Sequence, residues 1–116
     1  MKSKNVMESF KYALEGVKYA FKTERNIRIH FLAAIVVLVL SFILGIKGLD
    51  FALIIFSISL VIIAEMMNTA VESVVDLICQ ERHPLAAIAK NVAAGAVLVA
   101  ALNAVITGII IVWKYI

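Results

Sequence analysis

Three long apolar stretches without a charged residue dominate this chain of 116 residues. The first runs from Phe31 to Ile46, the second from Phe51 to Ala64 and the third from Val92 to Trp113. Hydrophobic residues make up 64% of the sequence, whereas roughly half is usual for a soluble domain. A helix of ~20 apolar residues crosses the hydrocarbon core of a bilayer. The sequence therefore predicts an all-α integral membrane protein with three transmembrane helices in a single domain, residues 1–116.

The boundaries of these helices are expected where charge or helix-breaking residues occur. The first membrane helix is expected over about 30–47, and residues 47–50, which include a glycine, are expected to form a tight turn. The second helix is expected over about 51–80, because its helical pattern continues past the apolar stretch and meets no Gly or Pro before Pro84. The third is expected over about 85–114, with Pro84 in its first turn.

The segment before the first apolar stretch has the pattern of an amphipathic helix. Between residues 5 and 22, apolar and charged side chains recur on separate stripes at helical spacing. The apolar stripe contains Phe10, Leu14, Val17 and Phe21, and the charged stripe contains Lys11, Glu15, Lys18 and Lys22. Helices of this kind lie in the membrane interface. We therefore expect residues 1–29 to form an N-terminal interfacial amphipathic helix, with an ordinary surface helix as the alternative.

The distribution of Lys and Arg predicts the orientation in the membrane. Residues 1–29 contain seven Lys and Arg but only three acids, and Arg82 and Lys90 lie between the second and third helices. The positive-inside rule places these segments in the cytoplasm and the C-terminus outside. A basic segment beside apolar helices suits an anionic leaflet, and a chain this apolar is not expected to bind nucleic acid.

Four polar residues share one face of the second helix where it leaves the apolar stretch. Glu65, Asn68, Glu72 and Asp76 are spaced i, i+3, i+7 and i+11. Three carboxylates so close together repel one another and are costly near lipid, so a positive group should meet them. Mg²⁺ is the simplest such group, because it binds one or two carboxylates together with substrate phosphates. The alternative is a solvated helix end whose acids pair with Lys and Arg.

Phosphoryl transfer is a reaction that such a set of residues could carry out. It requires positioning, neutralisation of phosphate charge and a carboxylate that takes the hydroxyl proton. The sequence contains neither G-x-x-x-x-G-K-[ST] nor G-x-G-x-x-G, so a nucleotide site here would differ from the common soluble types.

The same residues resemble the prokaryotic diacylglycerol kinase and undecaprenol kinase family. The pattern is Glu65-x-x-Asn68-Thr69-Ala70-x-Glu72-x-x-x-Asp76, then Glu81, Ala89-Lys90 and Ala94-Gly95-Ala96-Val97, with Lys22-Thr23-Glu24-Arg25-Asn26 before the first span. The likeness covers nearly the whole chain. It implies a lipid kinase that uses MgATP in the bacterial inner (cytoplasmic) membrane, as a homotrimer with active sites shared between subunits.

The resemblance also implies a role for individual residues. Glu65 matches the general base for the lipid hydroxyl, and Glu24 and Glu72 match the carboxylates that hold the divalent ions. The residues implied at the nucleotide and its phosphates are Lys90, Asp76, Glu81, His83 and Asn68. Asn91 departs from the family, which commonly has Asp there, and is given only a supporting role. His30 is expected to reach the lipid headgroups rather than to take part in chemistry.

The expected function is ATP-dependent phosphorylation of a membrane lipid alcohol. Undecaprenol is the expected acceptor, because the segment 22–26 looks like the Gram-positive branch of the family, and diacylglycerol, giving phosphatidic acid, is the alternative. A small ion-coupled transporter subunit is a distant alternative that explains Glu65 but not the polar cluster beside it. A purely structural membrane subunit would leave the acidic stripe without a purpose.

Overall fold

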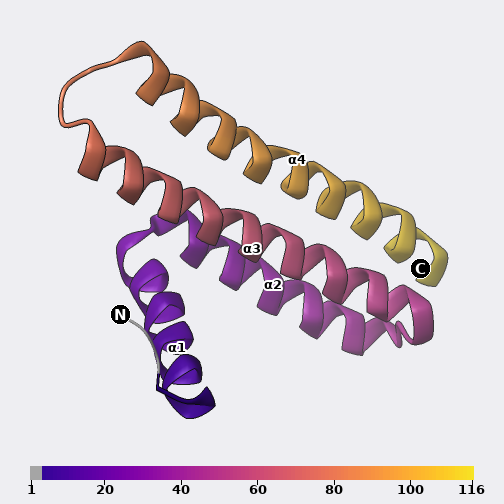
Figure 1. Ribbon diagram of the computed structural model, residues 1–116. Coiled ribbons are helices and arrows are strands. Elements are labelled where there is room, and N and C mark those ends of the chain that lie inside the picture. The colour runs from indigo at the N-terminus through magenta and orange to yellow at the C-terminus, as the bar shows by residue number, and fades with distance from the viewer. Residues whose placement is uncertain (1–3) are drawn as a thin grey trace.

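The structure, a computed structural model, describes residues 4–116, and over that range the chain forms four α-helices (Figure 1). They are α1 (Val6–Thr23), α2 (Arg25–Leu44), α3 (Gly48–Ile78) and α4 (Pro84–Tyr115). Helices α2, α3 and α4 run lengthwise beside one another in alternating directions, whereas α1 turns away from them at the beginning of α2 (Figure 1). The expected all-helical fold with three long apolar helices is confirmed.

All three long helices are long enough and apolar enough to cross a membrane. At ~1.5 Å per residue, the 31 residues of α3 and the 32 of α4 are about 46 and 48 Å long, which exceeds the ~30 Å of a hydrocarbon core. Many large apolar side chains lie on the surface, including Phe42, Phe56 and Trp113, with exposed fractions of 85%, 60% and 77%. Contact with lipid or with another protein chain explains apolar surface on this scale.

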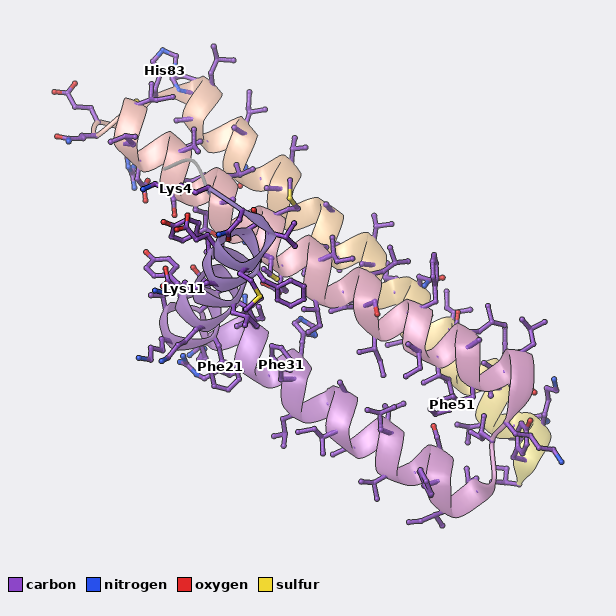
Figure 2. The ribbon with its side chains drawn as sticks, turned by 60° about the horizontal axis from the view of Figure 1, so that its bottom comes forward. Lys4, Lys11, Phe21, Phe31, Phe51 and His83 are labelled. Atoms are coloured by element: carbon purple, nitrogen blue, oxygen red, sulfur yellow. The ribbon has the colours of Figure 1, made fainter. Side chains whose placement is uncertain are left out.

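The junction between α1 and α2 is a single residue, Glu24, whose backbone is extended. Arg28 fixes this junction, because its Nη1 donates hydrogen bonds of 2.9 Å to the carbonyl oxygens of Phe21 and Lys22. These carbonyls have no partner within α1, as is usual in the last turn of a helix. The rings of Phe21 and Phe31 meet edge to face beside the junction, with centroids 5.4 Å apart (Figure 2).

The helix expected over residues 5–22 is therefore present, but the membrane helix begins earlier than expected. Helix α2 starts at Arg25 rather than near residue 30. Charged residues do not end a helix by themselves, and nothing in the segment from Arg25 to Ile29 interrupts one. Glu24 is thereby placed at the bend and His30 inside the second turn of α2.

The turn between α2 and α3 also differs from the one expected over residues 47–50. Gly45 ends α2 in the left-handed conformation with φ of 72°, and Ile46 donates its amide hydrogen to the carbonyl oxygen of Ser41 at 3.0 Å. This is the usual glycine-terminated helix end. Helix α3 then begins at Gly48, so the first acid after the turn, Asp50, lies inside the helix.

Asp50 ties the beginning of α3 to the end of α4. Its carboxylate accepts hydrogen bonds from Lys114 Nζ at 3.0 and 3.1 Å and from Tyr115 Oη at 2.8 Å. A small apolar core of Ile46, Ile54 and Ile111 is buried next to this contact. The two long helices are thus held together at the end opposite their connecting loop.

Helix α3 is the central element and packs against both α2 and α4. Its buried residues are Ile54, Ser57, Val61, Glu65, Asn68 and Thr69. They follow helical spacing along one face, and this face is apolar at one end and polar at the other. The packing that buries Val61 therefore also buries Glu65, four residues further along.

Candidate active site

Glu65 is the most deeply buried charged residue in the described part of the chain, with a side chain only 2% exposed. It projects from α3 toward α2, where His30 Nε2 lies 3.2 Å from its Oε1. A carboxylate held away from water requires a hydrogen-bond donor or a positive charge. His30 supplies that contact, so the expectation that it only reaches the headgroups is wrong.

The position of His30 follows from the packing of α2. The buried residues of this helix are Ile27, Ala34 and Ser41, spaced seven apart, and His30 lies between the first two on the same side of the helix. The sequence of this nearly all-apolar helix does not mark the side that faces α3, so the inward direction of His30 becomes evident only in the structure.

Asn68 and Glu72 form the next part of the site, one and two turns beyond Glu65 on α3. Asn68 Nδ2 donates a hydrogen bond of 2.8 Å to Glu72 Oε1. Asn68 is buried, and its Oδ1 is the one buried side-chain nitrogen or oxygen atom in residues 4–116 that has no hydrogen-bond partner. An unpaired buried acceptor is costly and calls for a donor from elsewhere. The amide of Asn68 thus points one group at Glu72 and leaves the other for a ligand.

Glu24 approaches the same region from the α1–α2 junction. Both Glu24 and Glu72 lie within electrostatic reach of Glu65, although Glu24 is 41 residues from Glu65 in the sequence. No ion pair with Lys or Arg involves any of them within the described chain. The alternative of a stripe neutralised by Lys and Arg therefore holds for Asp76 alone.

Glu24 and Glu72 suit a magnesium ion that is carried by a nucleotide. Within residues 4–116, no three His, Cys, Asp or Glu side chains come close enough to hold a metal ion on their own. Mg²⁺ does not need such a cage, because phosphate oxygens and water complete its six ligands. The two carboxylates that carry no ion pair fit this chemistry, and a protein-only metal centre does not.

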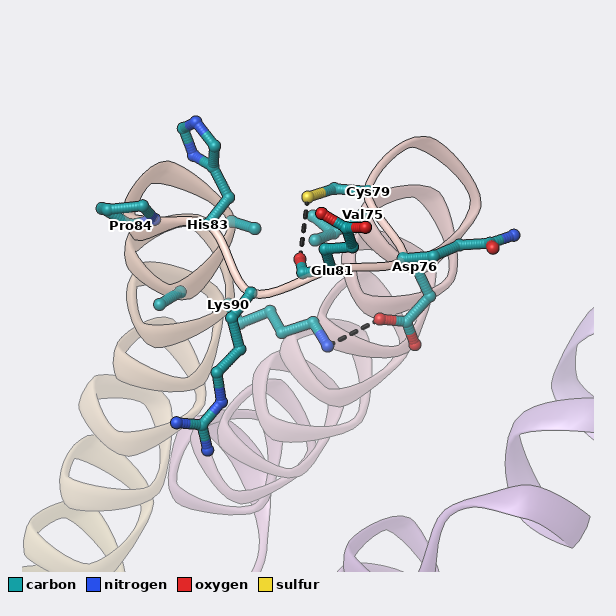
Figure 3. A pocket seen from close by; sticks show the side chains of 11 residues that line it. Val75, Asp76, Cys79, Glu81, His83, Pro84 and Lys90 are labelled. Carbon is teal, nitrogen blue, oxygen red and sulfur yellow. Dashed lines mark hydrogen bonds and ion pairs between the residues drawn. The ribbon is translucent and has the colours of Figure 1, made fainter.

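A separate hollow of about 570 Å³ lies between the end of α3 and the beginning of α4 (Figure 3). It brings together four residues expected near the nucleotide: Asp76, Glu81, His83 and Lys90. Lys90 Nζ lies 2.6 Å from Asp76 Oδ1. The pair is largely exposed to solvent, so it contributes little to stability. Its lysine is therefore available to a phosphate group.

The sequence model of the prokaryotic diacylglycerol kinase family matches residues 11–112. The chain belongs to this family. Family members are lipid kinases, a class of transferase, and use ATP as the phosphate donor. With its three apolar helices, the chain is a bacterial membrane protein.

Individual relatives carry two different names. A diacylglycerol kinase of Synechocystis sp. is 49% identical over 105 residues, which are 90% of this chain and 60% of the relative. An undecaprenol kinase of Bacillus subtilis is 39% identical over 104 residues, 90% of this chain and 85% of the relative. The diacylglycerol kinase of Escherichia coli is 34% identical over 110 residues, 95% and 90% of the two chains.

Two of the residues expected in this kinase site, His83 and Glu81, have structural contacts of their own, and a third is exposed. His83 Nδ1 accepts a hydrogen bond of 3.1 Å from the amide of Leu85 and so caps α4, and its ring points away from the Lys90–Asp76 pair (Figure 3). The backbone carbonyl of Glu81 accepts from Cys79 Sγ at 3.0 Å. Asn91 is exposed. Their roles toward a nucleotide stay predictions.

Proposed function

We propose that this protein transfers the γ-phosphate of MgATP to the hydroxyl of a membrane lipid alcohol. The observation that carries the proposal is the burial of Glu65 directly after the apolar stretch of α3, within electrostatic reach of two carboxylates without ion pairs. One carboxylate is then available as a base and two as ligands for a nucleotide-bound cation. A transporter with one carboxylate in the membrane would explain the buried Glu65 but not the two carboxylates near it.

In this reaction Glu65 takes the proton of the lipid hydroxyl. The hydroxyl oxygen forms a bond to the γ-phosphorus, and the bond between that phosphorus and the oxygen of ADP breaks. Glu24 and Glu72 would hold Mg²⁺, which when bound neutralises phosphate charge. Asn68 orients the Glu72 carboxylate through its hydrogen bond of 2.8 Å.

The nucleotide is proposed to reach from this centre to the hollow between α3 and α4. Glu65 and Asp76 are 11 residues apart on one helix, which corresponds to about 16 Å along its axis. Lys90 would leave Asp76 and bind phosphate, and Asp76, Glu81 and His83 would lie near the rest of the nucleotide. Asn91, which follows Lys90, has a supporting role.

The membrane arrangement is also part of the proposal. Helix α1 lies in the cytoplasmic interface of the inner membrane, because Val6, Phe10 and Leu14 are exposed on it beside its lysines. The N-terminus is cytoplasmic, and the C-terminus is outside. The exposed apolar surface of α4 is compatible with a homotrimer in which active sites are shared between neighbouring subunits, as the family resemblance implies.

Undecaprenol is proposed as the preferred acceptor, with diacylglycerol as the second candidate. The segment 22–26 and the Bacillus subtilis relative support undecaprenol. The higher identity to the Synechocystis sp. diacylglycerol kinase supports the second candidate. Either alcohol enters the site sideways from the bilayer, because Glu65 lies on a membrane helix.

The test is transfer of labelled phosphate from MgATP to each alcohol in matched micelles. Glu72→Ala should abolish transfer, whereas Glu15→Ala, which removes an exposed carboxylate of α1, should leave it unchanged. The alcohol with the higher kcat/KM is the preferred substrate. Folded wild-type protein that labels neither alcohol would refute the proposal and favour the transporter.

A further inference from the structure

His30 is the only donor that meets the carboxylate of Glu65 within the described residues. Thr69 Oγ1 donates to the backbone carbonyl of Glu65 at 3.0 Å, not to its carboxylate. Lys90 is paired with Asp76, and Arg28 is engaged with the carbonyl oxygens of α1. The contact of 3.2 Å between His30 Nε2 and Glu65 Oε1 is therefore what holds this side chain.

We propose that His30 is a positioning residue for phosphoryl transfer, which orients Glu65 toward the lipid hydroxyl. This inference rests on the proposed kinase function. When Glu65 is ionised, His30 Nε2–H donates to Oε1. The other oxygen, Oε2, accepts no hydrogen bond from residues 4–116 and is left to take the proton of the alcohol.

Two features of the surroundings make such a restraint necessary. The glutamate side chain has three rotatable bonds, and the nearby negative charges of Glu24 and Glu72 repel its carboxylate. A misplacement of about 1 Å is enough to cost on the order of 10²-fold in rate. The contact of 3.2 Å from His30 on α2, which is a different helix, would fix the carboxylate against this repulsion.

An imidazole suits this position better than Lys or Arg would. A permanent positive charge against the carboxylate would stabilise its ionised form and weaken it as a base. A neutral imidazole donates one hydrogen bond through Nε2–H and adds no net charge. It therefore orients Glu65 and leaves the carboxylate able to accept a proton.

His30 also stands between the base and the apolar part of the protein. It lines a hollow of about 520 Å³ between α2 and α4, whose other lining residues are almost all apolar, including Ala33, Val37 and Val105. The side chain is 27% exposed and also contacts Glu65. A lipid hydroxyl approaching from the bilayer thus meets Glu65 next to His30.

The first test compares kcat and KM for His30→Leu and His30→Gln. His30→Leu removes the donor and should lower kcat by about 10- to 100-fold, the value of one hydrogen bond to a charged group, with the KM for ATP unchanged. His30→Gln has an amide donor and should recover part of the lost kcat. Ser59→Ala, which removes an exposed hydroxyl of α3, is the control and should behave as wild type.

The decisive test is a double-mutant cycle with Glu65→Gln. If His30 acts through Glu65, His30→Leu causes no further loss of labelled product in the Glu65→Gln background. The inference would be overturned if the fold losses of the two single variants multiply in the double variant. A kcat of His30→Leu within about twofold of wild type would also overturn it. Wild-type protein inactive on both alcohols would refute the kinase function itself, whereas active wild type with a neutral His30→Leu refutes only the role of His30.

Discussion

Replacing the buried base by its uncharged isostere should make the protein more stable and much less active. Glu65→Gln keeps the volume of a side chain that is 2% exposed, and its amide can still meet His30 Nε2. The substitution removes the charge alone. It therefore separates the contribution of the carboxylate to kcat from its effect on the free energy of unfolding.

The magnitude follows from the surroundings of Glu65. Burial of an ionised carboxylate costs several kcal/mol, and one hydrogen bond from His30 returns about 1.5–3 kcal/mol of this. Glu24 and Glu72 add repulsion within electrostatic reach. Glu65→Gln should thus raise the free energy of unfolding by about 1–3 kcal/mol. Loss of the general base should lower kcat by about 10²–10⁴-fold.

Thermal unfolding and transfer of labelled phosphate, both in the same detergent micelles, measure the two effects. The midpoint of unfolding should rise for Glu65→Gln and stay constant for Glu15→Gln, whose carboxylate is exposed. A lower midpoint would show that Glu65 is a structural residue whose ionic contact stabilises the fold. A kcat close to that of wild type would remove Glu65 from the role of base.

Three further predictions concern the ends of the helices. Asp50→Ala should lower the midpoint of thermal unfolding, because it releases Lys114 and Tyr115 at the end of α4. The kcat of the folded protein should not change. A loss of kcat with an unchanged midpoint would contradict a purely structural role of Asp50. Gly45→Ala should lower the free energy of unfolding by about 1 kcal/mol. The cause is the backbone φ of 72°, because no atom lies within 4 Å of the added Cβ. A neutral effect in the same unfolding assay would show that the turn relaxes. Lys90→Ala should raise the KM for ATP far more than the KM for the lipid. An equal effect on both KM values would exclude a role of Lys90 in binding phosphate. Lys11→Ala is the control and should leave both KM values unchanged.

Much of the fold could be predicted because lipid and helix geometry leave few choices. Long apolar stretches have to become helices in a bilayer, where every backbone amide must be paired within its own segment. The spacing of Glu65, Asn68 and Glu72 likewise puts them on one face of any helix. These conclusions depend only on neighbours along the chain, and the structure agrees with them.

The bends and partners could not be predicted in the same way. Whether the chain turns at Gly45 or at Gly48 depends on which glycine ends the helix, and both have positive φ. The bend at Glu24 depends on Arg28, which binds carbonyl oxygens six and seven residues earlier. The glycines indicate a turn but not which of them ends α2, and no local pattern marks the bend at Glu24.

The sequence by itself determined that the chain is a membrane protein of three long apolar helices, and that an acidic face lies at the end of the second. Only the tertiary structure decided that His30 meets Glu65 and that Glu24 comes within electrostatic reach of Glu65. The physical reason lies in α2, which is apolar nearly all round. A helix in lipid has no polar side to mark its outer face, so its rotation, and hence the partner of Glu65, follows from packing against α3.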